Sequence, residues 1–422
     1  MTLYTRHLKD TEIKKLLKAE KTRQKKVVNL IASENYVSSD VLKALGSELT
    51  NKYAEGYPGK RYYGGNEYVD QIETLCKERA LKLFGLDAGS VGTQARKWHV
   101  NVQPLSGSPA NLAVFLGLVP PGGKIMGMSL AHGGHLTHGQ KVSITGKMWT
   151  PVHFGVDQKT ELIDYAALKA QAIAEKPAII VAGFTAYPRI VDFKQFRAVA
   201  DACGAILMVD MSHFAGLVAG AVYPSPFAYA DVVTTTTHKT LRGPRAALIF
   251  VRKDKSGLNP KGESVSFADL IDKAVFPGLQ GGPHLNQIAA VAVALKEAAT
   301  PAFQKYAAQV VQNAKALANE LSSLGWRVIS GGTDSHLVLI DTWMGGKKGG
   351  ADGKMGGITG EEASERLEKA GIIVNKNAIP FDTRPPMDPS GIRLGSAAET
   401  TRGKKEKDFR ALAQKIDKIL RK

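Results

Sequence analysis

The chain has little cysteine and no long hydrophobic run. Only two of its 422 residues are cysteine, Cys76 and Cys203, too few for a disulfide framework, which favours a reducing compartment. No segment approaches the roughly 20 apolar residues that a membrane-spanning helix needs. The N-terminal stretch contains Asp10, Glu12 and Glu20 and lacks an apolar core, which argues against a targeting peptide. We therefore expect a soluble, cytoplasmic protein.

Acidic residues are in deficit. Asp and Glu number 39 against 56 Lys and Arg, so the formal net charge is +17. Such an excess is compatible with binding to nucleic acid, an acidic membrane surface or anionic small molecules. Much of it lies in two Lys-rich segments of helical pattern, 14–26 and 402–422, and charge runs of this kind are usually solvated helix faces. An RNA-binding protein stays open as a remote alternative, although we expect neither a specific nucleic-acid partner nor a membrane partner.

Short apolar runs alternate with helical patterns along the middle of the chain. This alternation predicts a mostly parallel α/β sheet with ligands gathered at the strand ends. A long helical stretch over about 286–324 should lead to a second domain. The predicted strands are 124–130, 178–184, 205–210, 231–237 and 246–251 in the first domain, and 327–332, 336–341 and 391–395 in the second.

We expect three parts in the chain. They are an N-terminal helical arm and loop over 1–50, a large α/β domain over 51–295 and a smaller α+β domain over 296–422. The Gly- and Lys-rich segment 344–357 is typical of a flexible surface loop.

One lysine occupies a position where α/β folds place functional groups. Lys239 lies at the end of a β-branched run in "TTTTHKTLRGPR", and burial there would lower its pKa toward a free amine that can form a Schiff base. The strand "AILMVD" ends in Asp210, about one crossover unit earlier, so the two residues can end neighbouring strands. Pyridoxal phosphate needs such a pair, a lysine for its aldehyde and an acid for its pyridinium nitrogen. Taken alone, each residue also fits a plain structural role, a surface lysine or a helix-capping aspartate.

Two glycine-containing motifs are candidates for binding the cofactor phosphate. "SGSPAN", from Ser106 to Asn111, offers small hydroxyls and backbone N–H groups where a helix should begin, although plain capping would explain it as well. "FPGLQGGPH" contains Gly281 and Gly282, whose backbone could approach a phosphate from a neighbouring subunit or form only a turn.

A third motif, "LAHGGHLTHG", places three histidines in one glycine-rich loop. His132, His135 and His138 invite a metal interpretation, but no cysteine or acidic residue accompanies them. A histidine stacked on a pyridine ring explains the loop without a metal, and we expect none.

Nine motifs occur in one order along the chain, and together they identify a family. They are "LIASENYVS", "LTNKYAEGYPGKRYYGGNEYVD", "NVQPLSGSPAN", "AHGGHLTHG", "VDMSHFAGLVA", "TTTTHKTLRGPR", "FPGLQGGP", "VNKN" and "GIRLG". With these motifs, from about residue 10 to residue 403, the chain resembles serine hydroxymethyltransferase. The resemblance implies the pyridoxal phosphate-dependent transferase fold (fold type I, as in aspartate aminotransferase) and a shared-site homodimer or homotetramer.

The resemblance also implies the residues that bind the cofactor. Lys239 would form the Schiff base, Asp210 would pair with the pyridinium nitrogen and His135 would stack on the ring. The phosphate would be held by Ser106, Gly107 and Ser108, together with Tyr53, Gly281 and Gly282 of the partner subunit. Thr185, His213 and His238 would line the pocket.

The substrates follow from the same resemblance. Arg393 would bind the serine or glycine carboxylate, helped by Ser33 and by Tyr63 of the partner subunit, and Glu55 would act as acid and base near the hydroxymethyl group. Tetrahydrofolate would lie against Tyr62, Leu130, Gly134, Leu136 and Asn377. The implied reaction transfers the hydroxymethyl carbon of L-serine to tetrahydrofolate and yields glycine and 5,10-methylenetetrahydrofolate.

The chain departs from the family pattern after its arginine strand. "GSAAETTRGKK" follows Arg393 where the family usually has Gly-Thr-Pro-Ala, and the final helices look abbreviated. Ala246 and Ala247 replace a common glycine pair, so the backbone there must avoid positive φ. Because the departures lie on the folate side, a folate-independent aldolase acting on β-hydroxy amino acids, similar to threonine aldolase, stays open as an alternative.

Overall fold

A seven-stranded sheet forms the centre of the larger part of the protein. The computed structural model describes residues 8–87, 89, 97–259, 261–343 and 357–422. In the sheet the strand order is β4-β10-β9-β8-β7-β5-β6; the pairs from β9 to β6 are parallel, whereas β10 runs antiparallel to both of its neighbours. The strands are β4 (Trp98–Asn101), β5 (Lys124–Met128), β6 (Thr150–Phe154), β7 (Ile179–Gly183), β8 (Ile206–Asp210), β9 (Val232–Thr236) and β10 (Ala247–Arg252).

Both faces of this sheet are buried, which explains why its strands are continuous apolar runs rather than alternating ones. In β7, Ile180 and Ala182 belong to the apolar core on one face, and Ile179 and Val181 to the core on the other. The first face is covered by α4 (Glu67–Leu83), α7 (Tyr165–Glu175), α8 (Phe193–Cys203), α9 (Ala215–Ala219) and α11 (Leu285–Ala298). The second is covered by α5 (Gly107–Leu118) and α10 (Phe267–Lys273).

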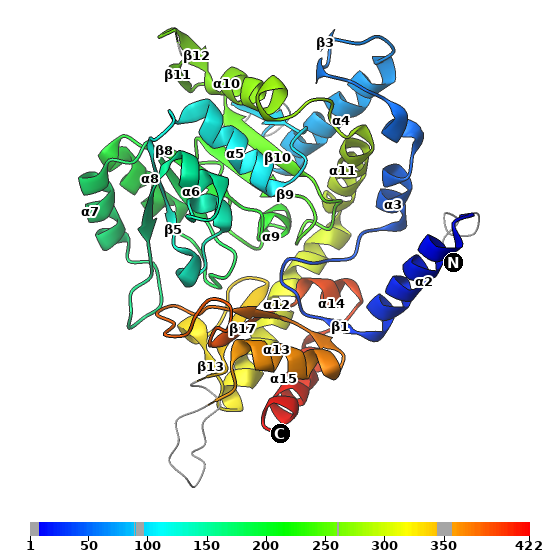
Figure 1. The fold of residues 1–422 in the computed structure, drawn as a ribbon, viewed down its shortest axis with the longest axis vertical. Helices are drawn as coiled ribbons and strands as arrows, with labels where there is room; N and C mark the ends of the chain where they lie inside the picture. Colours follow the sequence, from blue (N-terminus) through cyan, green and yellow to red (C-terminus); the bar gives the residue numbers. More distant parts are fainter. Residues whose placement is uncertain (1–7, 88, 90–96, 260, 344–356) are drawn as a thin grey trace.

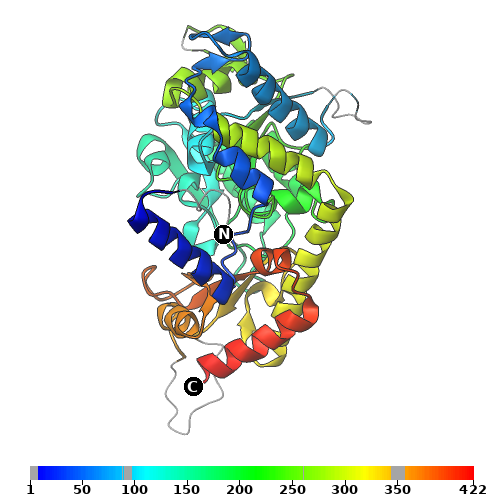
Figure 2. The ribbon, with the colours of Figure 1, turned by 90° about the vertical axis from the view of Figure 1, so that its right-hand side faces the viewer.

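The N-terminal segment runs along the side of the molecule (Figures 1 and 2). Helix α2 (Thr11–Lys26) begins at Asp10, whose carboxylate accepts hydrogen bonds from the amides of Glu12 and Ile13, and none of its residues is buried. The segment continues through β1 (Val28–Asn29), α3 (Ser39–Leu45), the 3-10 turn η1 (Glu48–Asn51) and the small hairpin of β2 (Gly56–Tyr57) and β3 (Lys60–Arg61). The hairpin lies at the far end of the molecule from the C-terminus (Figure 1).

The C-terminal part has its own antiparallel sheet, in the order β13-β14-β17-β16. Helix α12 (Pro301–Ser323) packs its first half into the core of the larger part and its second half into the core of this one. The strands and helices of the C-terminal part after α12 are β13 (Arg327–Val328), β14 (Leu337–Asp341), α13 (Gly360–Lys369), β15 (Ile372–Ile373), β16 (Asn375–Asn377), β17 (Gly391–Gly395), α14 (Ala397–Thr401) and α15 (Glu406–Leu420). Strand β15 pairs with β1, which attaches the N-terminal segment to this part.

The remaining described elements are short. They are the 3-10 turns η2 (Leu130–His132), η3 (Leu136–His138) and η5 (Ile329–Gly331), the helix α6 (Ile144–Met148), the hairpin of β11 (Ser256–Leu258) and β12 (Ser264–Ser266), and the π-helical turn η4 (Ala274–Leu279).

The predicted strands of both sheets are confirmed, although 327–332 shortens to β13 followed by η5. The predicted helical stretch over 286–324 is confirmed, but it consists of two helices, with a break between α11 and α12. Thr300 caps α12 through a hydrogen bond to the amide of Phe303, and Pro301 at the first helical position cannot continue the preceding helix. Strands β4 and β6 of the first sheet and β16 of the second were not predicted. The loop prediction for 344–357 lies outside the described residues except at Gly357.

Two kinds of feature are absent from the described residues. No helix there is long and apolar enough to cross a membrane. Likewise, the described His, Cys, Asp and Glu side chains form no group of three or more that could hold a metal ion.

Candidate active site

A polar cavity of ≈ 260 Å³ opens at the carboxyl ends of the parallel strands. Strands β9, β8, β7 and β5 are neighbours, and the loop that follows each of them contributes a side chain, so four separate sequence motifs meet at one edge. The predicted residues that line it are Ser33, Ser106, Gly107, Ser108, His135, Thr185, Asp210, His213, His238 and Lys239.

Lys239 follows β9 and points its amine at Thr236. Its Nζ donates to Oγ1 of Thr236 at 3.0 Å. Burial lowers the pKa of Lys239 to about 8; the charge of Asp210 raises it, and those of Arg393 and Arg245 lower it. A substantial fraction of this amine is therefore neutral near pH 8, which is the form that attacks an aldehyde.

Asp210 ends β8, beside β9, so the prediction that these two strands are neighbours is confirmed. Its carboxylate accepts hydrogen bonds from Nδ2 of Asn111 (2.8 Å), from the amide and hydroxyl of Ser212 (3.0 and 2.5 Å) and lies 3.2 Å from Nε2 of His138. Burial raises the pKa of Asp210, but these hydrogen bonds and the charge of His138 together lower it below its ordinary value. Asp210 is thus a buried, ionised carboxylate.

Helix α5 begins at the cavity, as "SGSPAN" predicts. Ser106 is its N-cap residue, but its side chain makes no hydrogen bond to the helix, so capping does not account for this serine. A Cβ added at Gly107 would lie 2.7 Å from Cγ2 of Thr236, closer than packed carbons approach. Free amides at the helix start, a hydroxyl not used in capping and a close backbone approach make a cradle that suits an anion.

The histidine loop supplies an imidazole to the same cavity. Nδ1 of His135 accepts from the amide of Thr137 at 3.1 Å, which leaves the proton on Nε2. Burial lowers the pKa of His135 to about 4, so its ring is neutral. His138 does not fit the role of a metal ligand, because its Nε2 lies within hydrogen-bond distance of Asp210.

Arg393, on β17, reaches toward the cavity across Thr185. Its Nη1 donates to the carbonyl of Thr185 at 2.6 Å, and its Nε donates to Oδ1 of Asn375 at 3.1 Å. Burial lowers the pKa of Arg393 to about 10, which still leaves it charged at neutral pH. Within the described part of the chain its side chain has no carboxylate partner. A partly buried cation therefore lies beside Thr185, which lines the cavity, with Nη2 available to an anionic ligand.

His213, which lines the cavity, stacks on His336, a buried histidine that was not predicted. Nδ1 of His213 lies 3.2 Å from Nε2 of His336, and the two rings are stacked at 5.4 Å. Burial lowers the pKa of His213 well below its ordinary value and that of His336 to about 3. His336 gave no sequence signal because a single histidine at the start of an apolar strand, "HLVLID", is indistinguishable from a core residue. Burial also lowers the pKa of His238 to about 3, and its Nδ1 has no hydrogen-bond partner among the described residues.

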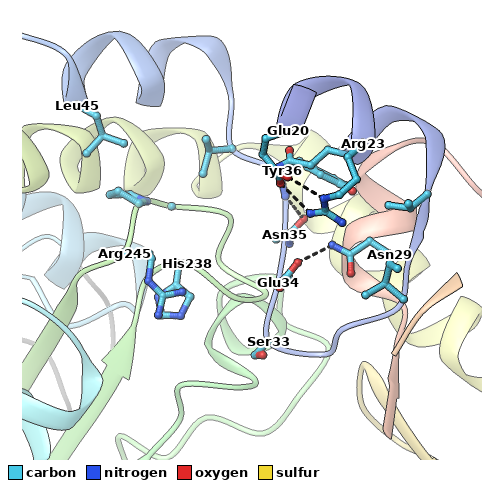
Figure 3. A pocket seen from close by; sticks show the side chains of 16 residues that line it. Glu20, Arg23, Asn29, Ser33, Glu34, Asn35, Tyr36, Leu45, His238 and Arg245 are labelled. Carbon is cyan, nitrogen blue, oxygen red and sulfur yellow. Dashed lines mark hydrogen bonds and ion pairs between the residues drawn. The ribbon is translucent and has the colours of Figure 1, made fainter. Parts of the chain in front are cut away.

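The N-terminal segment forms one wall of the site and of an adjoining cavity of ≈ 410 Å³ (Figure 3). Ser33, Glu34, His238 and Arg245 line both cavities. The side chain of Asn35 was not predicted as a site residue, yet its Nδ2 donates to the carbonyl of Lys239 at 2.9 Å.

The segment "GSAAETTRGKK" anchors this wall. Buried Glu399 accepts from the amide of Asn29 (2.9 Å) and pairs with Arg402 (2.9 Å) and Lys404 (2.7 Å). Thr401 donates to Asn35 at 2.7 Å. The departure from the family pattern therefore has a structural function, and it lies against the N-terminal wall. At the second departure, neither Ala246 nor Ala247 has a positive φ; the residue that does is Arg242, at 61°.

Six other predicted residues form a second cluster, which lines neither cavity: Tyr53, Glu55, Tyr62, Tyr63, Gly281 and Gly282. Tyr53 donates to Oε1 of Glu55 at 3.1 Å, and its ring meets that of Tyr63 edge-on at 5.3 Å. A Cβ at Gly281 would lie 3.1 Å from Glu55, and one at Gly282 would lie 3.0 Å from the ring of Tyr53. Tyr62 packs against Phe276 at 5.7 Å. Tyr53, Tyr62 and Tyr63 are at least half exposed in this chain.

The residues predicted to contact folate, apart from Tyr62 of the second cluster, lie in two segments outside the Lys239 cavity. Leu130, Gly134 and Leu136 belong to the loop after β5, and Asn377 ends β16. The rings of His132 and Phe381, 4.7 Å apart, bring these segments side by side.

Comparison with known proteins decides the family. Residues 7–416 match the family described as serine hydroxymethyltransferase. The chain belongs to the serine hydroxymethyltransferase family. It is 52% identical to the serine hydroxymethyltransferase of Desulfotalea psychrophila over 411 residues, which cover 97% of this chain and 88% of that protein. It is also 52% identical to those of Koribacter versatilis (98% and 89% covered) and Coprothermobacter proteolyticus (97% and 91% covered).

Membership of this family confirms the predictions of fold class and enzyme class. The mainly parallel α/β fold is fold type I of the pyridoxal phosphate enzymes, and the protein is a pyridoxal phosphate-dependent transferase, as predicted. The family uses pyridoxal phosphate and tetrahydrofolate. Neither the folate-independent aldolase nor the RNA-binding protein is favoured.

Proposed function

We propose that this chain binds pyridoxal phosphate at Lys239 and transfers the hydroxymethyl carbon of L-serine reversibly to tetrahydrofolate, giving glycine and 5,10-methylenetetrahydrofolate. One observation carries the proposal. A lysine amine of lowered pKa, an ionised carboxylate and an anion cradle at a helix start line one cavity. Arg393, which has no carboxylate partner in the described part of the chain, is hydrogen-bonded to Thr185 at the same cavity. Each suits a different part of the cofactor or the amino acid.

The residues present fit the cofactor. Ser106, Gly107 and Ser108 would hold its phosphate, Asp210 its ring nitrogen, His135 its ring face and Lys239 its aldehyde carbon. When bound, the cofactor supplies an electron-withdrawing ring that stabilises negative charge at the amino-acid Cα. Neutral His135 would contact the ring face without adding charge. Asp210, kept ionised by Asn111, Ser212 and His138, would hold a proton at the ring nitrogen.

The amino acid would bind through Arg393 and Ser33. The guanidinium is already oriented by Thr185 and Asn375, so little rotational freedom is lost when a carboxylate arrives. Burial of the site strengthens this charge-assisted pairing.

The second cluster would complete the site of a second copy of the chain. Tyr53, Tyr63, Gly281 and Gly282 would reach the partner's phosphate and carboxylate. Glu55 would reach the substrate hydroxyl and move its proton there, because Tyr53 hydrogen-bonds it into the same exposed group. Tyr62, with Leu130, Gly134, Leu136 and Asn377, would bind tetrahydrofolate. We therefore propose a homodimer or homotetramer, because one copy does not bring all these groups into one cavity.

We place the enzyme in the cytoplasm. Both cysteines are free thiols, Cys76 buried and Cys203 partly buried, which fits a reducing compartment.

The test is the visible absorption of the purified protein alone, with glycine, and with glycine plus tetrahydrofolate. We expect a yellow protein with a new long-wavelength band that requires both additions, and serine cleavage that tetrahydrofolate accelerates. A yellow protein that responds to glycine but ignores tetrahydrofolate would favour the aldolase alternative. A colourless protein that does not take up added pyridoxal phosphate would reject the assignment of Lys239.

The shared site has a separate test by subunit mixing. Chains with Lys239→Ala and chains with Glu55→Gln are each expected to be nearly inactive. After co-refolding in equal amounts, half of the dimers carry one of each chain and one intact site, so we expect about one quarter of wild-type activity. If the mixture stays as inactive as its components, Glu55 acts in its own subunit.

A further inference from the structure

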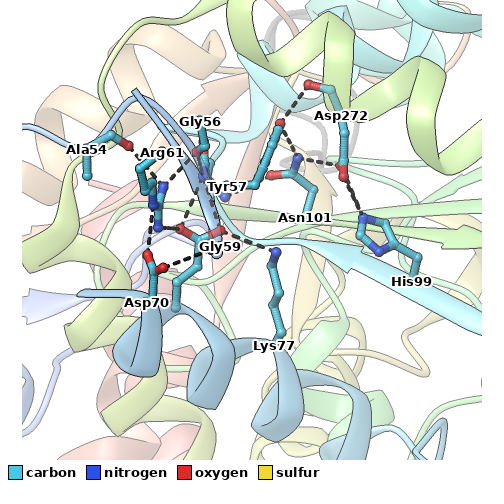
Figure 4. A network of polar contacts seen from close by, with 12 residues as sticks. Ala54, Gly56, Tyr57, Gly59, Arg61, Asp70, Lys77, His99, Asn101 and Asp272 are labelled. Carbon is cyan, nitrogen blue, oxygen red and sulfur yellow. Dashed lines mark hydrogen bonds and ion pairs between the residues drawn. The ribbon is translucent and has the colours of Figure 1, made fainter. Parts of the chain in front are cut away.

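The hairpin that carries Glu55 is held by one buried arginine (Figure 4). The side chain of Arg61 is only 4% exposed. Its Nη1 donates to the carbonyls of Ala54 (2.9 Å) and Gly56 (2.6 Å), the two residues on either side of Glu55. The amide of Tyr62, the next residue after Arg61, donates to the carbonyl of Glu55 itself at 3.1 Å. Three consecutive carbonyls are therefore fixed from one point.

Arg61 is fixed in turn by two carboxylates of helix α4. Its Nε donates to Asp70 at 2.9 Å, and its Nη2 donates to Glu73 at 2.7 Å. Glu73 is fully buried and is also paired with Lys77 at 3.3 Å. The side chain of Gln103 donates to both Glu73 and the carbonyl of Gly56. Because Gln103 lies just after β4, it connects Gly56 and Glu73 to the central sheet. The network joins the hairpin to the sheet and to α4.

The hydrogen bonds of Arg61 fix the backbone on both sides of Glu55, and so they determine the direction in which the Glu55 side chain projects. Ala54 and Gly56 are buried against Arg61, whereas the side chain of Glu55 between them is only half-buried, next to exposed Tyr53. Gly56 has φ +92°, and a Cβ there would lie 2.3 Å from the carbonyl of Lys60, so the chain turns sharply at this residue. Because Arg61 holds the chain before and after Glu55 and the chain turns at Gly56, the Glu55 side chain projects outward in a single direction.

We propose that Arg61 is a positioning residue for Glu55. It holds the backbone on either side of Glu55 so that the carboxylate projects in the direction needed by the neighbouring subunit's site. The inference rests on the proposed function, in which Glu55 moves a proton at the substrate hydroxyl.

A lysine at this position tests the inference, because it keeps the charge but cannot serve both carbonyls and both carboxylates at once. For Arg61→Lys we expect a kcat for serine roughly 10- to 100-fold lower with a KM changed less than about threefold, as for a group that acts in the transition state. Combined with Glu55→Gln, it should cause no further loss, since both changes remove the same contribution. Amide hydrogen exchange at Tyr62 should become faster in Arg61→Lys without any ligand.

Arg197→Lys is the matched control. Arg197 likewise bridges carboxylates, Asp231 and Asp201, and the carbonyls of Tyr229 and Ala205, but it lies outside the hairpin. It should lower the melting temperature and leave kcat per folded site unchanged. If Arg61→Lys behaves like this control, or if its effect adds to that of Glu55→Gln, the inference is wrong. If Glu55→Gln itself keeps full kcat, the proposed role of Glu55 fails instead.

Discussion

The side-chain amide of Asn35 donates a hydrogen bond of 2.9 Å to the main-chain carbonyl of Lys239. The same nitrogen donates to the hydroxyl of Tyr306 at 2.8 Å, and Oδ1 of Asn35 accepts from Thr401 at 2.7 Å. The N-terminal segment, helix α12 and helix α14 therefore meet at the residue that we propose binds the cofactor.

Replacing Asn35 with alanine should loosen the lysine loop. The change leaves buried polar groups unpaired, so we expect the free energy of unfolding to fall by about 1–3 kcal/mol. We also expect faster release of pyridoxal phosphate, measured by dilution into a trap for the free cofactor. Thr401→Val is the control, because it removes one bond to Asn35 and keeps the bond to Lys239; it should lower stability without changing release. Equal release rates in both variants would show that Asn35 is only structural.

The pH dependence of cofactor binding should reveal the lowered pKa of Lys239. Only the neutral amine attacks the aldehyde, so the rate of uptake by cofactor-free protein should rise with pH and level off above the pKa of about 8. Below it, the rate should fall about tenfold per pH unit. Because the charge of Asp210 raises the pKa of Lys239, Asp210→Asn should move the midpoint to lower pH. A midpoint near the ordinary lysine value of 10.5 would contradict the burial of this amine.

Much of the fold could be predicted because its strands are buried on both faces and so stand out as apolar runs. Strand β4 could not be, since "WHVN" mixes polar with apolar residues; its Asn101 side chain bonds to Tyr57 and Asp272 instead of packing in the core. The antiparallel direction of β10 also left no local signal, because strand direction depends on how the loop after Lys239 returns to the sheet.

Within the site, the residues at strand ends were predictable and the residues that support them were not. Lys239 and Asp210 are found by the rule that ligands gather at the carboxyl ends of parallel strands. Asn35 is 204 residues from the carbonyl it binds. Arg61 holds the backbone around Glu55, but in the sequence it looks like an ordinary charged surface residue. Such contacts depend on the completed tertiary structure.

Gly107 should be required at the proposed phosphate site, the start of α5, because Cγ2 of Thr236 leaves no room for a side chain there. In Gly107→Ala the new Cβ would lie 2.7 Å from Cγ2 of Thr236, so helix α5 or β9 must shift. We expect roughly tenfold weaker pyridoxal phosphate binding in an equilibrium titration. Thr236→Ser removes that methyl group and keeps the hydroxyl that accepts from Lys239, so Gly107→Ala/Thr236→Ser should recover most of the affinity. If the double variant binds no better than Gly107→Ala, the methyl contact is not the cause.

Arg393 should determine amino-acid affinity through its geometry as well as its charge. Two of its nitrogens are used by Thr185 and Asn375, which leaves Nη2 toward a carboxylate. A lysine at 393 would keep the charge but offer one compact ammonium, which cannot hold Thr185 and the substrate together. We expect Arg393→Lys to raise the KM for serine roughly 10- to 100-fold, the loss of about one charge-assisted hydrogen bond or slightly more, with a smaller effect on kcat.

The matched control for this change is Asn375→Ala, which removes only the acceptor for Nε. It should raise the KM for serine by roughly threefold, because the bond from Nη1 to Thr185 still orients the guanidinium. Direct binding of glycine, followed by its effect on the visible spectrum, separates affinity from turnover in each variant. If Arg393→Lys lowered kcat while its affinity for glycine stayed at the wild-type value, the carboxylate would have to bind elsewhere, and Ser33, which lines both cavities, would be the next residue to replace.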